Sequence, residues 1–284
     1  MNEVRHETVK ANGIEFHVAA TGDPKAPLLL MLHGFPECWY SWRHQLEAFA
    51  DRFHCVAPDL RGYGDSEKPK SGYDLATLSQ DAAELIRALG YEEAFVAGHD
   101  WGGAITWDLV RRHPDVVKKY AVLNCPPSEI LLREVMTSFR QLRRSWYIFF
   151  FQLPFFPERR LTKKEGAIIP RVFLSGATRR DAFHREELNV FREAILKPGA
   201  VKGALSYYRS ARKRTPLPDE PIRVPGLLLW GKDDPFLGIE MTHKLEPLVE
   251  APLSIQYIDQ CGHWTQQEAP EEVNDALGKF FSTS

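Results

Sequence analysis

The segment at residues 95–103, FVAGHDWGG, constrains the fold of this 284-residue chain more than any other stretch. It opens with a short apolar run and continues as Gly-X-Asp-X-Gly, which is typical of a buried strand, a sharp turn and a helix. In such a turn, called a nucleophile elbow, small residues allow strained backbone to present one side chain. The segment therefore predicts an α/β protein in which Asp100 stands on the turn and a helix opens at Gly102.

The group presented on this turn is the carboxylate of Asp100, where many proteins with such a turn carry a hydroxyl. A carboxylate attacks without first losing a proton, and the ester it forms is built on its own carbonyl. We therefore expect the electrophile to be an sp3 carbon rather than an acyl group.

The composition excludes several classes of protein. Hydrophobic residues make up 44% of the chain and charged residues 26%, as in an ordinary soluble globular protein. The formal net charge of -2 gives no indication of a nucleic-acid partner or of an anionic membrane surface. One segment is locally basic, which we interpret as a solvated surface, with an anion or lipid-surface contact as the alternative. It contains Arg140, Arg143, Arg144, Arg159, Arg160, Lys163 and Lys164.

The cysteines and the first residues bear on cofactors and location. Cys38, Cys55, Cys125 and Cys261 show no metal-ligand spacing, so we expect free thiols and no metal. The phosphate-binding pattern GxGxxG is absent, and no cofactor is predicted. The first residues lack the apolar core of a signal peptide, and no stretch approaches the roughly 18 apolar residues of a membrane span. A cytoplasmic location is the resulting expectation.

Strand and helix patterns alternate through the first part of the chain. Residues 7–10 and 14–20 predict two strands joined by a two-residue turn at Asn12 and Gly13. Apolar stretches at 27–32, 53–58 and 120–123 predict further strands, buried on both faces of a parallel sheet. The spacing of apolar residues predicts helices at 41–49, 75–89 and 102–113.

The second part of the chain contains an insertion. Residues 126–214 show helical patterns rich in arginine and aromatic residues and no convincing buried strand. A proline-rich return at 215–221 precedes strands predicted at 226–230 and 253–258 and a helix at 271–281. We therefore predict a mostly parallel central sheet flanked by helices, with a core domain at residues 1–125 and 215–284 and an inserted helical cap domain at residues 126–214.

Three candidate catalytic positions follow strands of the predicted core. Asp100 follows the elbow strand, an aspartate at 233 or 234 follows the strand at 226–230, and His263 follows the strand at 253–258. In open α/β sheets, ligands bind at the carboxyl ends of strands. A nucleophile, an acid and a histidine in this chain order match a hydrolase triad, with Asp233 and Asp234 both candidates for the acid.

Three motifs give the chain a resemblance to the α/β-hydrolase superfamily across essentially its whole length. They are HGFPE at residues 33–37, DLRGYGDS at 59–66 and GHDWGG at 98–103. Within the superfamily the chain most resembles the soluble epoxide hydrolases, whose motifs these match almost letter for letter. The resemblance implies an α/β-hydrolase fold with a cap (lid) and hydrolysis of an apolar epoxide to a vicinal diol. Its partners would be a small-molecule epoxide and water, with a homodimer left open.

The resemblance also assigns the triad. Asp100 would be the nucleophile that forms a covalent alkyl-enzyme ester. Neutral His263, oriented by Asp234, would then activate the water that hydrolyses this ester. Asp234 is preferred over Asp233 because it stands where the family places its acid.

Further roles follow for the residues around the nucleophile. The backbone N–H groups of Phe35 and Trp101 are expected to form the oxyanion hole, and the family suggests a cis bond before Pro36. It also places Glu37 and His99 near the hydrolytic water, with structural support as the alternative role.

Opening an epoxide requires a donor for the leaving oxygen, because an unprotonated alkoxide in an apolar pocket is costly. In the family two phenols of the cap supply it. Tyr147, four residues before Phe151-Gln152, and Tyr208, directly before Arg209, stand in strings that resemble the corresponding cap segments. Tyr207 is expected to fill the core instead.

Two other functions compete with this interpretation. A haloalkane dehalogenase uses the same nucleophile and must solvate a halide, which Trp101 could do, with Trp146 as a substitute donor. Many dehalogenases carry an asparagine where this chain has Phe35, whose side chain donates no hydrogen bond. The other alternative is a catalytically silent ligand-binding protein, although such proteins usually lose a triad member, and here Asp100, Asp234 and His263 are all present.

Overall fold

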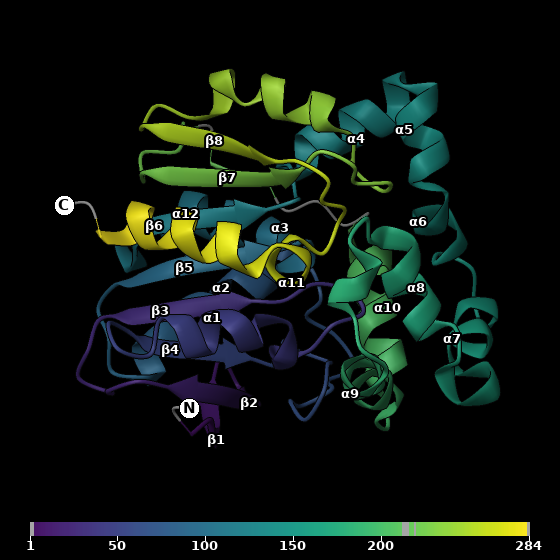
Figure 1. Cartoon of the computed structure of the whole chain (residues 1–284), viewed down its shortest axis with the longest axis horizontal. Coiled ribbons are helices and arrows are strands. Elements are labelled where there is room, and N and C mark those ends of the chain that lie inside the picture. Colours follow the sequence, from purple (N-terminus) through teal and green to yellow (C-terminus); the bar gives the residue numbers. More distant parts are fainter. Residues whose placement is uncertain (1–2, 212–215, 219, 283–284) are drawn as a thin grey trace.

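The centre of the molecule is an eight-stranded sheet with the order β1-β2-β4-β3-β5-β6-β7-β8 (Figure 1). The computed structural model describes residues 3–211, 216–218 and 220–282. β2 pairs antiparallel with β1 and with β4, and the other neighbouring strands are parallel. The strands are β1 (Arg5–Ala11), β2 (Ile14–Thr21), β3 (Leu28–Leu32), β4 (His54–Pro58), β5 (Ala94–His99), β6 (Val117–Leu123), β7 (Gly226–Gly231) and β8 (Leu253–Ile258).

The predicted strands are confirmed, with small shifts at their ends. β3 and β4 are buried at every position, as expected for strands covered on both faces. The hairpin between β1 and β2 turns at Asn12 (φ 44) and Gly13 (φ 78), the conformation that a two-residue hairpin turn requires. β6 begins at Val117, earlier than the predicted residue 120, because Lys118 and Lys119 interrupt the apolar run without ending the strand.

Helices cover both faces of the sheet. α1 and α12 lie on one face, over an apolar core that includes Leu46 and Leu277, and α2 and α3 lie on the other, over a core that includes Leu85 and Leu109 (Figure 1). The helix predicted at 41–49 is instead a 3-10 turn and a short helix, because Trp42 (φ -100, ψ 13) leaves the helical region. These elements are η1 (Trp39–Trp42), α1 (Arg43–Ala48), α2 (Leu75–Ala88), α3 (Trp101–Arg112), η2 (Pro114–Val116), η4 (Ile239–Lys244), η5 (Glu246–Leu248), α11 (Thr265–Glu268) and α12 (Pro270–Ser282).

The insertion after β6 is helical, as predicted. Residues 124–211 form helices and no strand, and these cap helices stand together at one end of the sheet (Figure 1). Tyr208 of the cap meets Phe35, just beyond β3, with ring centroids 5.3 Å apart, so the cap covers the carboxyl ends of the parallel strands. The cap helices are α4 (Ser128–Thr137), α5 (Phe139–Arg144), α6 (Trp146–Phe150), α7 (Phe156–Gly166), α8 (Ile169–Gly176), η3 (Arg180–Ala182), α9 (Arg185–Leu196) and α10 (Ala200–Ser210).

The domain boundary expected between residues 214 and 215 lies outside the described residues. Within the described ranges, no helix combines the length and the apolar character needed to cross a membrane.

Candidate active site

Asp100 stands between β5 and α3 on a turn with unusual backbone geometry. Its φ of 49 and ψ of -116 lie outside the regions that most residues occupy. The turn is tight enough to require glycine beside it: a methyl group on Gly98 would lie 2.3 Å from the carbonyl oxygen of Gly102, and one on Gly102 would lie 2.0 Å from that of Leu32. The strand, sharp turn and helix predicted from the sequence are therefore confirmed.

The loop after β3 supplies a hydrogen bond to the Asp100 carboxylate. The backbone N–H of Phe35 donates to Asp100 Oδ1 at 2.8 Å. Gly34 makes this approach possible, since a Cβ there would lie 2.4 Å from the Cβ of Asp100. The Phe35-Pro36 peptide bond is cis, as expected. Trp101, the other predicted donor, places its amide at the first residue of α3, directly after Asp100.

His263 and Asp234 meet next to Asp100. His263 Nδ1 lies 2.7 Å from Asp234 Oδ2, and His263 Nε2 lies 3.6 Å from Asp100 Oδ2. The other oxygen of Asp234 accepts hydrogen bonds from the amides of Phe236 at 2.7 Å and Leu237 at 3.0 Å. Asp234 and His263 are buried, whereas Asp233 is exposed. The structure thus brings Asp234, and not Asp233, into contact with the histidine.

The three groups form a buried cluster of charges. Burial alone would lower the pKa of His263, but the charge of Asp234 and the contacts with Asp100 outweigh it and raise the pKa to about 10. Burial would raise the pKa of both aspartates, yet His263 holds each of them below its usual value. These shifts favour an imidazolium between two carboxylates in the free protein, whereas the role expected from the sequence needs His263 neutral when water is activated.

The two phenols predicted in the cap lie close to each other, and Tyr208 packs against Phe35 and Trp101, on either side of Asp100. Tyr208 is buried, with its ring edge-on to Trp101 at 5.1 Å between centroids, and Tyr147 lies edge-on to Tyr208 at 6.1 Å. Burial raises the pKa of both phenols well above the ordinary range, and the charge of Asp100 adds to the shift. Both groups therefore remain protonated donors near neutral pH. Tyr207 points elsewhere, donating to the backbone oxygen of Arg61 at 2.8 Å, as expected for a core residue.

Glu37 and His99 are bound within the protein. His99 is fully buried, and its ring nitrogens face Glu37 Oε2 and the backbone oxygen of His263, each at 2.8 Å. Glu37 also accepts hydrogen bonds from the amide of Gly34 at 2.7 Å and from the side chains of Gln266 and Gln267. These partners take up the polar atoms of both residues, which favours structural support of the loops around Asp100 over direct contact with water.

Asn124 is a residue that the sequence analysis missed. It follows β6, is fully buried, and donates from Nδ2 to Asp234 Oδ2 at 2.8 Å. Its Oδ1 accepts a hydrogen bond from the amide of Gly231 at 3.0 Å, so Asn124 fixes both the acid and the end of the strand before it. Its place at the carboxyl end of a parallel strand is the signal that could have identified it.

Glu268 was also missed, and no local pattern points to it. Its buried carboxylate accepts four backbone hydrogen bonds: Oε2 from Thr178 at 2.8 Å, Arg179 at 3.0 Å and Gly262 at 3.0 Å, and Oε1 from Trp264 at 3.1 Å. Two of these amides flank His263, and the other two belong to the cap. Glu268 therefore ties the histidine loop to the cap.

The cap binds the same loop a second time through α8. The amide of His263 donates to the backbone oxygen of Gly176 at 2.8 Å, and the indole of Trp264 donates to that of Phe173 at 2.8 Å. A Cβ on Gly262 would lie 2.2 Å from the oxygen of Gly176, so the two segments touch along their backbones. The position of His263 thus depends on the cap as well as on β8.

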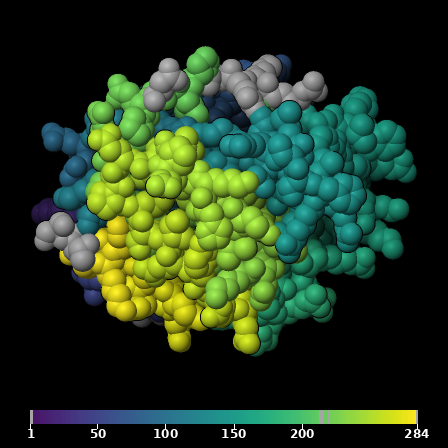
Figure 2. All heavy atoms as spheres, turned by 90° about the horizontal axis from the view of Figure 1, so that it is seen from above, coloured from purple at the N-terminus to yellow at the C-terminus, as the bar shows by residue number. Residues whose placement is uncertain are grey.

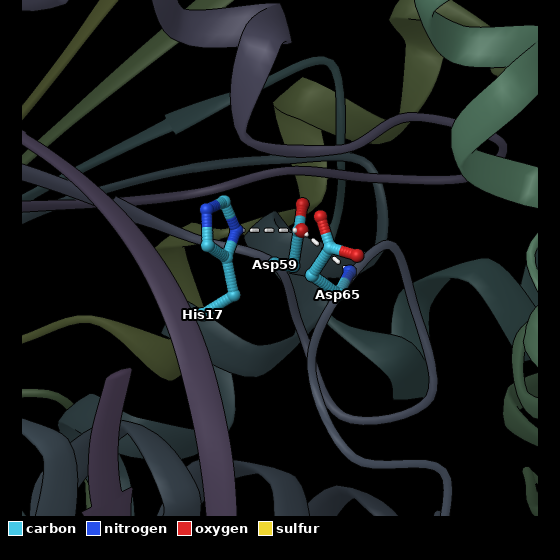
Figure 3. Close-up of side chains that lie close together, drawn as sticks. All are labelled: His17, Asp59 and Asp65. Atoms are coloured by element: carbon cyan, nitrogen blue, oxygen red, sulfur yellow. Dashed lines mark hydrogen bonds and ion pairs between the residues drawn. The ribbon is translucent and has the colours of Figure 1, made fainter. Parts of the chain in front are cut away.

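One group of potential metal ligands occurs among the described residues, away from this site. The ligand atoms of His17, Asp59 and Asp65 lie within 4.8 Å of one another (Figure 3). The Asp59 oxygens already face protein partners, namely His17 Nδ1 at 2.8 Å and the amides of Asp65 at 2.9 Å and Trp39 at 3.0 Å. Asp65 in turn pairs with Lys197 of the cap. We interpret this group as a structural link between β2, the loop after β4 and the cap.

Comparisons with known proteins agree with this arrangement. The family described as alpha/beta hydrolase fold matches residues 27–270. Epoxide hydrolase 3 of Xenopus tropicalis is 39% identical over 279 residues, which cover 96% of this chain and 76% of that protein. Epoxide hydrolase A of Mycobacterium tuberculosis is 33% identical over 310 residues, covering 96% of each chain.

Solved structures give the same result. The Bacillus megaterium epoxide hydrolase in complex with an inhibitor superposes with a TM-score of 0.90 at 29% identity, covering 98% of this chain and 100% of that one. An epoxide hydrolase from metagenomes of hot environments superposes with a TM-score of 0.87 at 32% identity, covering 99% and 100%. The chain therefore belongs to the α/β-hydrolase fold family, and within that family it resembles the epoxide hydrolases.

Proposed function

We propose that the protein is an epoxide hydrolase that converts an apolar epoxide to its vicinal diol through a covalent ester on Asp100. The observation that carries the proposal is that two phenols of the cap come together near a carboxylate: Tyr208 packs against Trp101, the residue after Asp100, and Tyr147 packs against Tyr208. Opening an epoxide requires a nucleophile that attacks the ring carbon and a proton donor for the ring oxygen, and these groups can supply both.

In the first step, Asp100 attacks one carbon of the epoxide ring. Oδ1, held by the amide of Phe35, remains the carbonyl oxygen, and Oδ2 forms the new bond to carbon. The bond between that carbon and the ring oxygen breaks, and the oxygen takes a proton from Tyr147 or Tyr208. The products are an alkyl ester of Asp100 and a free hydroxyl group on the neighbouring carbon.

In the second step, water attacks the carbonyl carbon of the ester. Esterification removes the charge of Asp100, which is one cause of the raised pKa of His263, so the imidazolium gives up its proton more readily. This proton restores the tyrosine that was deprotonated in the first step, and neutral His263 then serves as the base that takes a proton from the attacking water. The negative oxygen that develops on Asp100 lies at the amides of Phe35 and Trp101, which form the proposed oxyanion hole. Collapse of this intermediate breaks the ester bond, and the oxygen of the departing diol takes the proton that His263 removed from water. Asp100, left as a carboxylic acid, then gives its proton to His263, which restores the carboxylate and the imidazolium.

The division into domains belongs to the same proposal. Residues 1–125 and 215–284 form the core domain, which supplies Asp100, Asp234 and His263. Residues 126–214 form the cap domain, which supplies the two phenols. We assign Glu37 and His99 to support of the loops that surround the hydrolytic water, because their polar atoms have protein partners.

The alternative function, that of a haloalkane dehalogenase, has less support. Phe35 offers no side-chain donor, and the side chain of Trp146, considered as a substitute donor, is 63% exposed. A panel of epoxides, haloalkanes and an activated ester separates the proposals: we expect diol formation from epoxides and no halide release, whereas tight binding without any turnover would favour a silent ligand-binding protein.

A single turnover in water enriched in heavy oxygen tests the covalent route. With enzyme in excess, the oxygen from water enters the carboxylate of Asp100, and the first diol carries the former Asp100 oxygen without label. Mass spectrometry of the peptide that contains Asp100 detects the label. Heavy oxygen in the first diol and none on Asp100 would contradict the ester mechanism.

A further inference from the structure

The outer edge of the cap carries an unusual concentration of exposed apolar side chains. Nine large hydrophobic residues are exposed in the described part of the chain, and all except Tyr257 fall in one short stretch of the cap. Two of them, Phe139 and Phe155, are 81% and 82% exposed. We call this set the crest; it consists of Met136, Phe139, Leu142, Trp146, Phe149, Leu153, Phe155 and Phe156.

The crest occupies one side of the molecule. Its residues come from the consecutive helices α4, α5, α6 and α7 and the loops between them; α4 lies near β7 and β8, and α5, α6 and α7 run along the outer side of the cap (Figure 1). In the space-filling view, the teal atoms of this part of the chain gather on a single side (Figure 2). Large exposed apolar side chains gathered on one part of a protein often mark a site where a partner or a membrane binds.

The crest lies among positive charges. Eight arginine and lysine residues and four glutamates lie between residues 128 and 166, although the whole chain has a net charge of -2. Three of the glutamates are paired with basic residues from other parts of the protein: Glu129 with Arg111, Glu134 with Lys244 and Glu158 with Arg209. Six exposed basic side chains form no ion pair within the described residues: Arg133, Arg143, Arg159, Arg160, Lys163 and Lys164.

We propose that the crest is a docking surface for a bilayer that contains anionic phospholipids. Exposed phenylalanine, leucine and tryptophan beside arginine and lysine are the combination with which a peripheral surface enters the interface between headgroups and acyl chains. A second copy of the chain is the weaker candidate, since a twofold contact would set the unpaired cations of two crests against each other.

Lipid docking would place the bilayer next to the helix that closes the active site. On α6, Tyr147 packs inward against Tyr208, while Trp146 and Phe149, one residue before it and two after it, point outward and are exposed. An apolar epoxide dissolved in the bilayer would then meet the protein beside its site. This consequence rests on the proposed function, whereas the docking itself does not.

Co-sedimentation of the whole protein with vesicles tests the docking without any measurement of turnover. We expect binding to vesicles of phosphatidylcholine mixed with phosphatidylserine, weaker binding to phosphatidylcholine alone, and loss of binding at high salt. Arg159→Glu combined with Arg160→Glu, or Phe139→Ser combined with Phe155→Ser, should each reduce the apparent partition coefficient by about tenfold or more.

The matched control is Tyr257→Ser, the exposed apolar residue outside the crest, which should leave binding unchanged. Unaltered thermal melting of each crest variant shows that the fold is intact. Equal binding by the wild-type protein and both crest variants would overturn the proposal. The proposal would also be overturned if the protein bound no vesicle and sedimentation velocity showed a dimer. In that case Phe139→Ser should convert the dimer to a monomer.

Discussion

His263 Nε2 lies 3.6 Å from Asp100 Oδ2, close enough for a charged contact but beyond ordinary hydrogen-bond length. The imidazole therefore does not hold the carboxylate through a short bond, and Oδ2 stays free to approach a carbon atom. Because the charge of Asp100 also raises the pKa of His263, the two residues are coupled: an ionised Asp100 favours the protonated histidine, and in the proposed mechanism formation of the ester would make His263 a better base.

Replacing the histidine should separate the two chemical steps. In His263→Gln we expect Asp100 to be alkylated while hydrolysis of the ester slows by about a thousandfold or more, because the water loses its base. Intact-protein mass spectrometry after addition of an epoxide should then show a stable adduct. Asp100→Asn should show none, and undiminished turnover by His263→Gln would contradict the role assigned to the base.

Replacing the phenols should affect the other step. Tyr147→Phe and Tyr208→Phe should each slow alkylation by roughly 10- to 100-fold, and the double variant should abolish it, since the leaving oxygen would lack a donor. Stopped-flow measurement of alkylation checks this. Tyr207→Phe serves as the control, because its hydroxyl bonds to the backbone of Arg61; it should lower stability by about 1 kcal/mol and leave alkylation unchanged. Wild-type alkylation in the double variant would remove both phenols from the mechanism.

The charges of the site should make stability depend on pH. The pKa of His263 is raised from 6.5 to about 10, so its contribution is complete below pH 6.5 and is lost as the pH rises toward and through about 10. The full loss would be a few kcal/mol at most. Denaturant unfolding of the wild-type protein and of His263→Gln should show a difference in stability that shrinks across this range. A constant difference from pH 6 to pH 10 would show that the histidine is not charged in the folded state.

At acidic pH the two aspartates make stability change with pH in the opposite direction. The pKa values of Asp100 and Asp234 are lowered, so their contribution is present above their ordinary values near 3.8 and is lost as the pH falls through the lower values in the folded state.

Replacing Glu268 tests whether this residue positions the loop that carries His263. Glu268→Ala would leave four amides without their acceptor, two of them buried, which should cost about 3 kcal/mol of stability. The more specific test is Glu268→Gln. Displacement of the histidine loop should slow hydrolysis of the ester about tenfold and change alkylation little, because His263 acts in the second step. Glu271→Gln, an exposed acid in the next helix, is the matched control. Equal slowing of both steps would indicate general loss of structure instead.

Much of the fold could be predicted because its signals are local. The run before Asp100 and the glycines around it fix a strand, a turn and a helix within ten residues, and the uninterrupted apolar runs of β3 and β4 identify strands covered on both faces. β6 was predicted too short because Lys118 and Lys119 break the apolar run, although the strand continues through both of them.

The supporting contacts of the site could not be predicted in the same way. Asn124 and Asp234 are 110 residues apart, and Glu268 and Thr178 are 90 residues apart, so no local pattern marks either pair. The neutral imidazole was expected from the role of His263 as a base, whereas its raised pKa depends on two carboxylates that only the fold brings together. The residues alone left Asp233 and Asp234 both open, and only the family resemblance favoured Asp234; the contact of Asp234 with His263 follows from the fold.

The bond between the amide of His263 and the carbonyl oxygen of Gly176 restricts how the enclosed site can be reached. A movement that lifted α8 away from the sheet would break this bond and carry the base out of line with Asp100. A cap that opened without displacing His263 would have to keep α8 in place and separate from the core elsewhere. The epoxide would then enter, and the diol leave, on the side of α6. The opening that controls each catalytic cycle would lie away from His263.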